Sequence, residues 1–275
     1  MQPSTFYSSL VEGNLEAVSQ ALDASPWLIT VRNPKENAWD ENSPLHCAAK
    51  HGHLPLVKLL IEKGAEVYSN PLATYPPVMI AAWNKQQPVV DYFLNEIPDK
   101  AVGTNNLGIT ANLAARQGWT DIVRKHTAAD PLSVHQRGWI GDTPLHWPAH
   151  NNHAEIVNLL LDAGADIEAD EINCYGGKPL HWASEHSPVT VRLLLERGAN
   201  VNARNIRPSS VFYGVTPLIM NATQKDDRSE VTELLLNAGA EIDARDHTEK
   251  TALGHALERD LKGIMEVLRR HGATT

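Results

Sequence analysis

Two histidines and a glutamate in the middle of the chain have the side chains of an acid–base site. His150 stands in the segment PAHNNH, and Glu185 and His186 are neighbours in WASEHS. An imidazole and a carboxylate can exchange protons near neutral pH, and Arg116 could hold a carboxylate or a phosphate. His150, Glu185 and His186 are therefore the candidate catalytic residues, on the condition that the fold brings them together, which the sequence alone does not show.

The familiar sequence marks of catalysis are absent. The chain has no GxSxG, P-loop, GxGxxG or kinase signature, and neither Cys47 nor Cys174 has the context of a nucleophile or of a disulfide framework. The thirteen histidines form no HExxH or other dense ligand set, so a metal site would need distant segments to converge. We therefore predict no metal and no cofactor, and the motifs favour a non-enzymatic protein.

Composition excludes several classes of partner. The net charge is −9 without a basic stripe, which argues against nucleic acid because phosphate neutralisation supplies most of that affinity. No window approaches the apolar length of a membrane span, and the N-terminal segment MQPSTFYSSLVEGN does not resemble a secretion signal. We expect a soluble, cytoplasmic protein that binds neither nucleic acid nor membrane.

One motif recurs along the chain. The segment SPLHCAAKHGHLPLVKLLIEKGAEV at 43–67 is echoed at 143–167 and again at 178–201, with weaker copies between and after them. Matching positions are 33 to 38 residues apart, a spacing typical of short helical-pair repeats, and they are His46, Met79, Asn112, His146, His181, Ile219 and Gly254.

Each repeat predicts a pair of helices. Ser or Thr followed by Pro starts the first helix, because the hydroxyl caps free amides and Pro at the first position loses no hydrogen bond. The second helix has apolar residues at helical spacing and ends at the Gly of a GA pair. The expected caps are Gly64, Gly164, Gly198, Gly239 and Gly272.

The pattern TPLHxAAxxGHxxIVxxLLxxGAxxN resembles the signature of the ankyrin repeat, and the resemblance covers essentially the whole chain. It implies an all-α solenoid of about eight stacked helix pairs with projecting hairpin loops. We predict a single domain, 1–275, with an N-terminal cap repeat at about 3–32, central repeats at about 33–245 and a C-terminal cap repeat at about 246–275. The resemblance also implies a structural role for His46, His146 and His181.

The ankyrin signature does not fix the residue type at two sets of positions. One set lies just before the Gly that follows each first helix, and the other lies at each hairpin tip. Here these positions and their neighbours are rich in aromatic residues and histidines, which are frequent at binding hot spots. Trp147 and Trp182 follow the PLH motif in neighbouring repeats and should pack together. The predicted concave binding groove comprises Trp39, Asp40, His51, Tyr75, Trp83, Arg116, Trp139, Asp142, Trp147, His150, Tyr175, Trp182, Glu185, His186, Phe212 and Tyr213.

Two functions fit such a groove. The first is an adaptor that recognises a partner, most often a protein, and we expect the adaptor itself to be monomeric. The second is a closed central pocket for a small molecule or saccharide, with acid–base chemistry by His150, His186 and Glu185. An adaptor needs a long open groove, whereas an enzyme needs a focused cavity.

Overall fold

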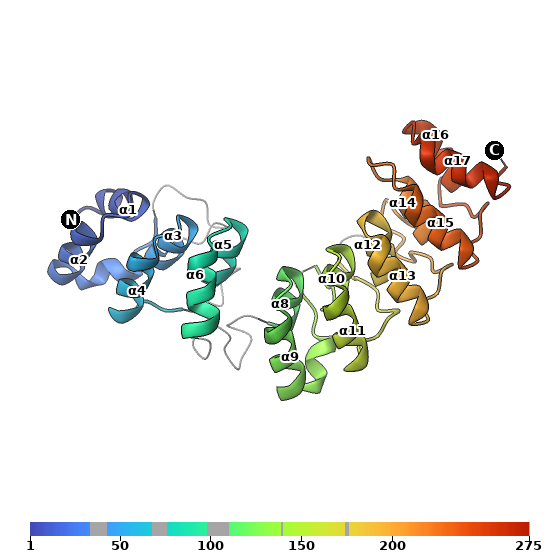
Figure 1. Cartoon of the computed structure of the whole chain (residues 1–275). Coiled ribbons are helices and arrows are strands. Elements are labelled where there is room, and N and C mark those ends of the chain that lie inside the picture. The colour runs from blue at the N-terminus through green and yellow to red at the C-terminus, as the bar shows by residue number, and fades with distance from the viewer. Residues whose placement is uncertain (34–42, 68–75, 98–109, 139, 174–175, 275) are drawn as a thin grey trace. The chain divides into compact units, whose positions relative to one another are not determined.

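The chain is described from a computed structural model, shown in Figure 1. Its backbone forms two compact units, Met1–Thr110 and Ala111–Thr275, which are described separately. The structure describes residues 1–33, 43–67, 76–97, 110–138, 140–173 and 176–274.

Unit 1 contains three successive helix pairs in its described residues. The first helices of these pairs pack against one another in order, and so do the second helices (Figure 1). A 3-10 turn, Pro26–Thr30, follows the first pair, and a turn of π-helix, Tyr92–Glu96, follows the third. The pairs are α1 (Pro3–Val11) with α2 (Leu15–Ala24), α3 (Pro44–Lys50) with α4 (Leu54–Glu62), and α5 (Pro77–Trp83) with α6 (Gln87–Asp91).

Unit 2 contains five pairs in its described part. Its first helices follow one another along the concave side of the unit, and its second helices lie on the convex side (Figure 1). The first helices are α8 (Ala111–Gln117), α10 (His146–His150), α12 (Pro179–His186), α14 (Pro217–Ala222) and α16 (Ala252–Glu258). The second helices are α9 (Thr120–Ala129), α11 (Ala154–Asp162), α13 (Pro188–Glu196), α15 (Ser229–Asn237) and α17 (Lys262–Arg270).

These eight pairs confirm the all-α solenoid for the described residues, which contain no β-strand. None of the described helices is long and apolar enough to cross a membrane. The predicted helix starts are confirmed at Ser43 and Thr216, whose hydroxyls accept the backbone N–H three residues later. Thr251, which Ala follows in place of Pro, caps α16 in the same way. The second helices end as expected at glycines with positive φ, such as Gly164 at 91°.

The core lies between the two layers of helices. The second helices carry consecutive apolar residues, but only those that face the first helices are fully buried. Leu160 in α11 and Leu194 in α13 have no exposed surface, and Val157 and Val191 lie beside them one turn earlier. Every repeat therefore buries its apolar face against its neighbours, as expected for an array in which one repeat could not fold alone.

The histidines of the PLH motif are structural, as predicted. His181 has no exposed surface, its Nδ1 accepts the backbone N–H of Lys178 at 3.3 Å, and its Nε2 lies 3.0 Å from the carbonyl of Val215 in the next repeat. Because an N–H group points at Nδ1, the ring proton must be on Nε2, which donates to the carbonyl. His146 repeats this arrangement between Thr143 and Gly177.

Burial lowers the pKa of both His146 and His181 from the ordinary 6.5 to about 4, because the charged ring would lose its hydration. Protonation would also place a hydrogen on Nδ1, where a backbone N–H already donates. Both rings are therefore neutral at pH 7, and each bridges two successive repeats.

The projecting loops are closed by backbone hydrogen bonds at their bases. The amide of Asn205 donates to the carbonyl of Val215 at 3.0 Å, and the amide of Glu171 donates to the carbonyl of Gly177 at the same distance. Neighbouring tips are also joined, since the amide of His247 donates to the carbonyl of Tyr213 at 3.2 Å. The tip that carries Tyr213 is thus supported by the next tip along unit 2.

The cap of α2 gives a first testable prediction. The exposed Asn14 side chain accepts the backbone N–H of Ala17 at 3.0 Å. Asn14→Ala should lower the free energy of unfolding by about 1 kcal/mol, because an amide at the helix start loses its acceptor. Asn14→Asp keeps an acceptor and should be nearly neutral. Urea unfolding measures both, and equal losses in the two variants would contradict this role of the side chain.

Candidate functional site

Five residues of the predicted groove lie outside the described residues, namely Trp39, Asp40, Tyr75, Trp139 and Tyr175. Two others belong to unit 1, where the exposed His51 and Trp83 stand at the ends of α3 and α5. The remaining predicted residues belong to unit 2, and most of them come together at the ends of its first helices.

The centre of this cluster is a pair of tryptophans on α10 and α12. The rings of Trp147 and Trp182 lie edge to face, with centroids 5.0 Å apart and planes at 88°. Trp182 is only 6% exposed and also contacts the ring of the structural His146, at 5.2 Å. The predicted packing of the two tryptophans is confirmed, and it fixes the ends of two neighbouring repeats relative to each other.

Arg116, at the end of α8, extends the cluster to a third repeat. Its guanidinium carbon lies 3.9 Å from the centre of the Trp147 ring, a cation–π contact. The backbone carbonyl of Arg116 accepts the side-chain amide of Asn151 at 3.0 Å. Three successive first helices are thus joined by side-chain contacts on the same face of unit 2.

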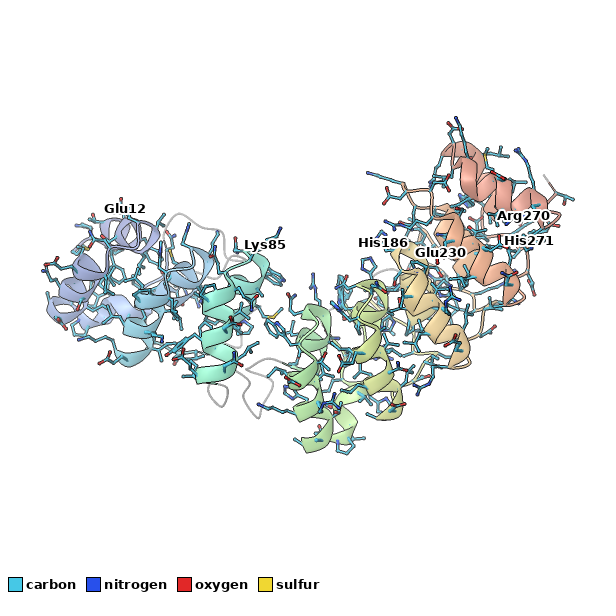
Figure 2. The ribbon with its side chains drawn as sticks, viewed as in Figure 1. Glu12, Lys85, His186, Glu230, Arg270 and His271 are labelled. Atoms are coloured by element: carbon cyan, nitrogen blue, oxygen red, sulfur yellow. The ribbon has the colours of Figure 1, made fainter. Side chains whose placement is uncertain are left out.

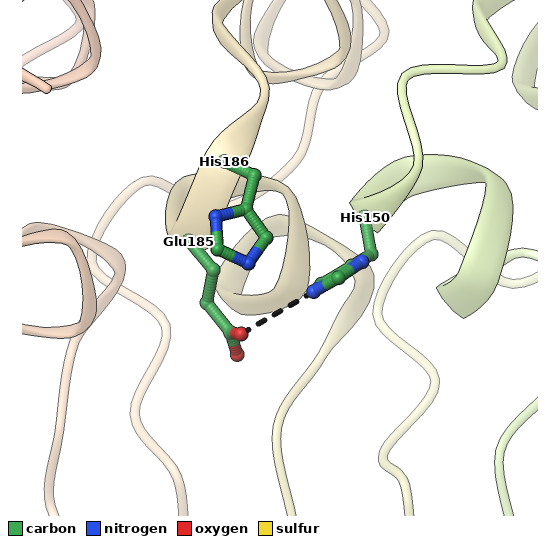
Figure 3. Close-up of side chains that lie close together, drawn as sticks. All are labelled: His150, Glu185 and His186. Atoms are coloured by element: carbon green, nitrogen blue, oxygen red, sulfur yellow. Dashed lines mark ion pairs between the residues drawn. The ribbon is translucent and has the colours of Figure 1, made fainter. Parts of the chain in front are cut away.

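His150, Glu185 and His186 converge beside the tryptophans (Figure 3). Nε2 of His150 lies 3.5 Å from Oε2 of Glu185, and the centroids of the two imidazole rings are 4.6 Å apart. The His150 and Glu185 side chains are about three-quarters buried, whereas His186 is exposed at the end of α12 (Figure 2). The convergence that the sequence left open is therefore present in the structure.

The pKa values of the two imidazoles are shifted in opposite directions. Burial disfavours the charged form of His150, but hydrogen bonds to Glu185 and Asn151 and the charge of Glu185 outweigh it and raise its pKa. For His186, burial and the nearby His150 lower the pKa. His150 therefore binds a proton more readily than the neighbouring His186 does, a difference of the kind found in acid–base pairs.

Asp142 differs from its neighbours in the predicted groove because it is buried. Its Oδ2 accepts the side-chain amide of Asn112 at 2.9 Å, and desolvation raises its pKa. Asn112 occupies the repeat position that His146 and His181 fill elsewhere. The carboxylate therefore joins a hairpin to α8 and is not exposed to a partner.

The last two predicted residues, Phe212 and Tyr213, belong to the hairpin tip at 205–214. This tip is enlarged, since the matching positions on either side of it, His181 and Ile219, have the longest spacing, 38 residues. Phe212 is partly buried and Tyr213 is exposed. The most exposed apolar residue of this tip is Val211, with 73% of its surface accessible, and Ile206 is also largely exposed. The tip therefore presents a small apolar surface to solvent.

The repeats seen in the sequence and in the fold match known family models. The description "Ankyrin repeats (3 copies)" matches residues 7–106 and 109–205, and "Ankyrin repeat" matches residues 213–247. The chain belongs to the ankyrin repeat family. The cluster described above therefore occupies the first helices of three successive ankyrin repeats, α8, α10 and α12. The enlarged tip at 205–214 is the hairpin that precedes α14.

Several proteins are similar to this ankyrin chain over most of its length. A Caenorhabditis elegans homolog of transient receptor potential cation channel subfamily A member 1 is 25% identical over 82% of the chain. Ankyrin repeat protein nuc-2 of Neurospora crassa is 27% identical over 92% of it, and the C. elegans ankyrin repeat and KH domain-containing protein mask-1 is 31% identical over 97%. The matched regions make up 15%, 22% and 10% of these proteins, so the chain spans less than a quarter of each relative.

Three residues that bear on the site were not among the sequence candidates. Val211 and Ile206 lie on the enlarged tip, whose length was visible in the sequence, but aliphatic residues in a loop do not indicate which way they face. Asn151 occupies a free ankyrin position, and only its contacts to His150 and Arg116 show that it connects two repeats.

Proposed function

We propose that this ankyrin chain is an adaptor that binds a partner protein along the concave face of unit 2. The enlarged tip at 205–214 and the cluster of Arg116, Trp147, His150 and Glu185 are the two contact regions. The observation that carries the proposal is an apolar tip that is exposed and yet held by hydrogen bonds.

The tip is fixed at both ends and from both sides. The amide of Gly214 donates to the carbonyl of Asn205 at 2.8 Å, and the guanidinium of Arg207 donates to the carbonyl of Ile172 in the preceding tip. A surface that is already ordered loses little conformational entropy on binding. Exposed apolar side chains on such a surface favour contact with another protein, since they gain most from being covered.

The tryptophan cluster supports a protein partner more than a flat ligand. A sugar ring or a planar metabolite would need an open indole face on which to stack. Trp182 is almost fully buried, and the Arg116 guanidinium covers one face of Trp147. What the cluster presents to solvent is mainly charged and polar, and these groups suit the polar rim of a protein interface.

A substitution at the tip tests the proposal. Proteins bound to the wild-type chain would first be isolated from cells that express it, and the affinity of the main partner would then be measured with purified components. Val211→Asp places a carboxylate in the apolar contact and should weaken binding at least about tenfold, because a charge would be buried without a partner.

Leu132→Asp is the matched control. Leu132 lies in the 3-10 turn Pro131–His135 of the same unit, which packs against α9. It is 72% exposed, and Val211 is 73% exposed. This variant carries the same new charge and should bind the partner within about twofold of the wild type. Equal affinities for Val211→Asp and the wild type would remove the support for the tip as a contact region.

A further inference from the structure

We propose that His150, Glu185 and His186 bind a zinc ion, with at least one coordination position open to the concave face. This inference goes beyond partner binding and does not depend on it. The sequence predicted no metal because the histidines are dispersed along the chain, but repeat stacking places this ligand set together.

The spacing of the three ligands fits a single ion. One atom from each side chain can be chosen so that all lie within 4.8 Å of one another (Figure 3). Zinc binds nitrogen and oxygen at about 2.0 to 2.2 Å, so neighbouring ligand atoms in a tetrahedral site are roughly 3.3 to 3.5 Å apart. Nε2 of His150 and Oε2 of Glu185 already have this separation, at 3.5 Å. Small side-chain rotations would bring the exposed His186 to the same ion.

Asn151 selects the tautomer that a neutral His150 ring needs in order to bind a metal through Nε2. The Asn151 amide nitrogen donates to the carbonyl of Arg116 at 3.0 Å, so its oxygen must be the atom that lies 2.9 Å from Nδ1 of His150. In a neutral ring, Nδ1 then carries the proton and donates it, which leaves the lone pair on Nε2, the nitrogen that faces Glu185. A hydrogen bond from the second ring nitrogen is the usual support for a histidine that binds metal.

The ligands also stand on fixed elements. His150 is the last residue of α10, and Glu185 and His186 are the last two of α12, whose positions are set by the buried Trp182. The carbonyl of His186 accepts a hydrogen bond from Arg228 in the next repeat at 3.3 Å. Ligands on packed helix ends change position less than ligands on free loops.

The donor set selects zinc over magnesium and calcium. Two imidazoles and one carboxylate suit zinc, whereas magnesium and calcium prefer sites made of oxygen ligands. Arg116 acts electrostatically on His150 and Arg228 on His186, and these positive charges weaken the attraction of any ion that relies on charge alone. Three protein ligands leave room for water or for a side chain of a partner.

Calorimetric titration of the untagged full chain with zinc chloride at neutral pH tests the site. We expect one zinc ion per chain, and we expect Glu185→Gln and His186→Gln each to weaken binding by about tenfold or more. Asn151→Ala should weaken it by about tenfold through the loss of His150 orientation. Circular dichroism establishes that each variant is folded, and His186 is exposed enough for its replacement to leave the fold intact.

His271→Gln is the matched control. His271 also faces a carboxylate, with Nε2 at 3.1 Å from Glu233, and it lies beside Arg270 at the end of α17 (Figure 2). Among the described residues, His271 and Glu233 belong to no group of three side chains that could hold a metal ion. The His271→Gln variant should therefore keep wild-type zinc affinity. The proposal would be overturned if the chain bound no zinc, or if Glu185→Gln bound zinc as tightly as the wild type. Loss of zinc binding in His271→Gln, or displacement of zinc by an equal concentration of calcium, would also contradict it.

Discussion

Acidification from pH 7 to pH 4 is expected to lower the free energy of unfolding of unit 2 by up to about 6 kcal/mol through two buried histidines. His146 and His181 have folded pKa values of about 4, compared with 6.5 in the unfolded chain. Between these values the unfolded state binds more protons than the folded state. The contribution of these two histidines to the free energy of unfolding is therefore fully present above pH 6.5. It falls as the pH drops toward 4, by about 3 kcal/mol for each histidine.

His181→Gln isolates one of these contributions. The Gln amide can still donate to the carbonyl of Val215 but takes up no proton in this pH range. The variant will be less stable at pH 7, yet its further loss between pH 6.5 and 4 should be smaller than that of the wild type by about 3 kcal/mol. Urea unfolding at several pH values measures this difference. Equal losses in the two proteins would show that His181 is not buried as a neutral ring.

Trp182→Ala is expected to cost about 3 to 5 kcal/mol, the range typical of removing a buried Trp side chain. Its ring fills the space between α10 and α12 and contacts His146, Trp147 and His150. Its removal should leave a cavity at the junction of two repeats and release the side chains that form the candidate site. The loss of unfolding free energy in urea measures the effect, and the same variant should bind the partner more weakly.

Trp27→Ala is the matched control for this substitution. Trp27 lies in the 3-10 turn Pro26–Thr30 of unit 1, and 55% of its surface is exposed. Removal of the same number of atoms from an exposed position should cost less than about 1 kcal/mol, because little apolar surface is lost from the core. If both variants lost the same stability, Trp182 would not be the packed centre of the cluster.

Much of the fold could be predicted because residues that start and end helices recur at the same positions of successive repeats. Ser or Thr before Pro marks the start of a first helix, as at Ser43, and a Gly in a GA pair marks the end of a second, as at Gly164. The buried histidine of each PLH motif was predicted as well. Division of the backbone into two compact units at Thr110 was not predicted, since the repeat pattern continues on both sides of that position.

The candidate site was only partly predictable. His150 and Glu185 each stand four residues after the histidine of a PLH motif, so repeat stacking makes them neighbours. Whether their side chains turn toward each other depends on rotamers and on the packing of Trp182, which a single sequence does not specify. The burial of Asp142 depends on the amide of Asn112, in a repeat whose PLH motif is degenerate.

Hydrogen–deuterium exchange of the chain, with and without the partner isolated as above, gives the most direct test of binding on the concave face. Backbone amides become protected where the partner covers them or orders the backbone. We predict protection of residues 205–214 and of the helix ends at 146–150 and 182–186, with little change in α9, α11 and α13. Protection confined to those second helices, with an unchanged tip, would contradict the proposed binding face.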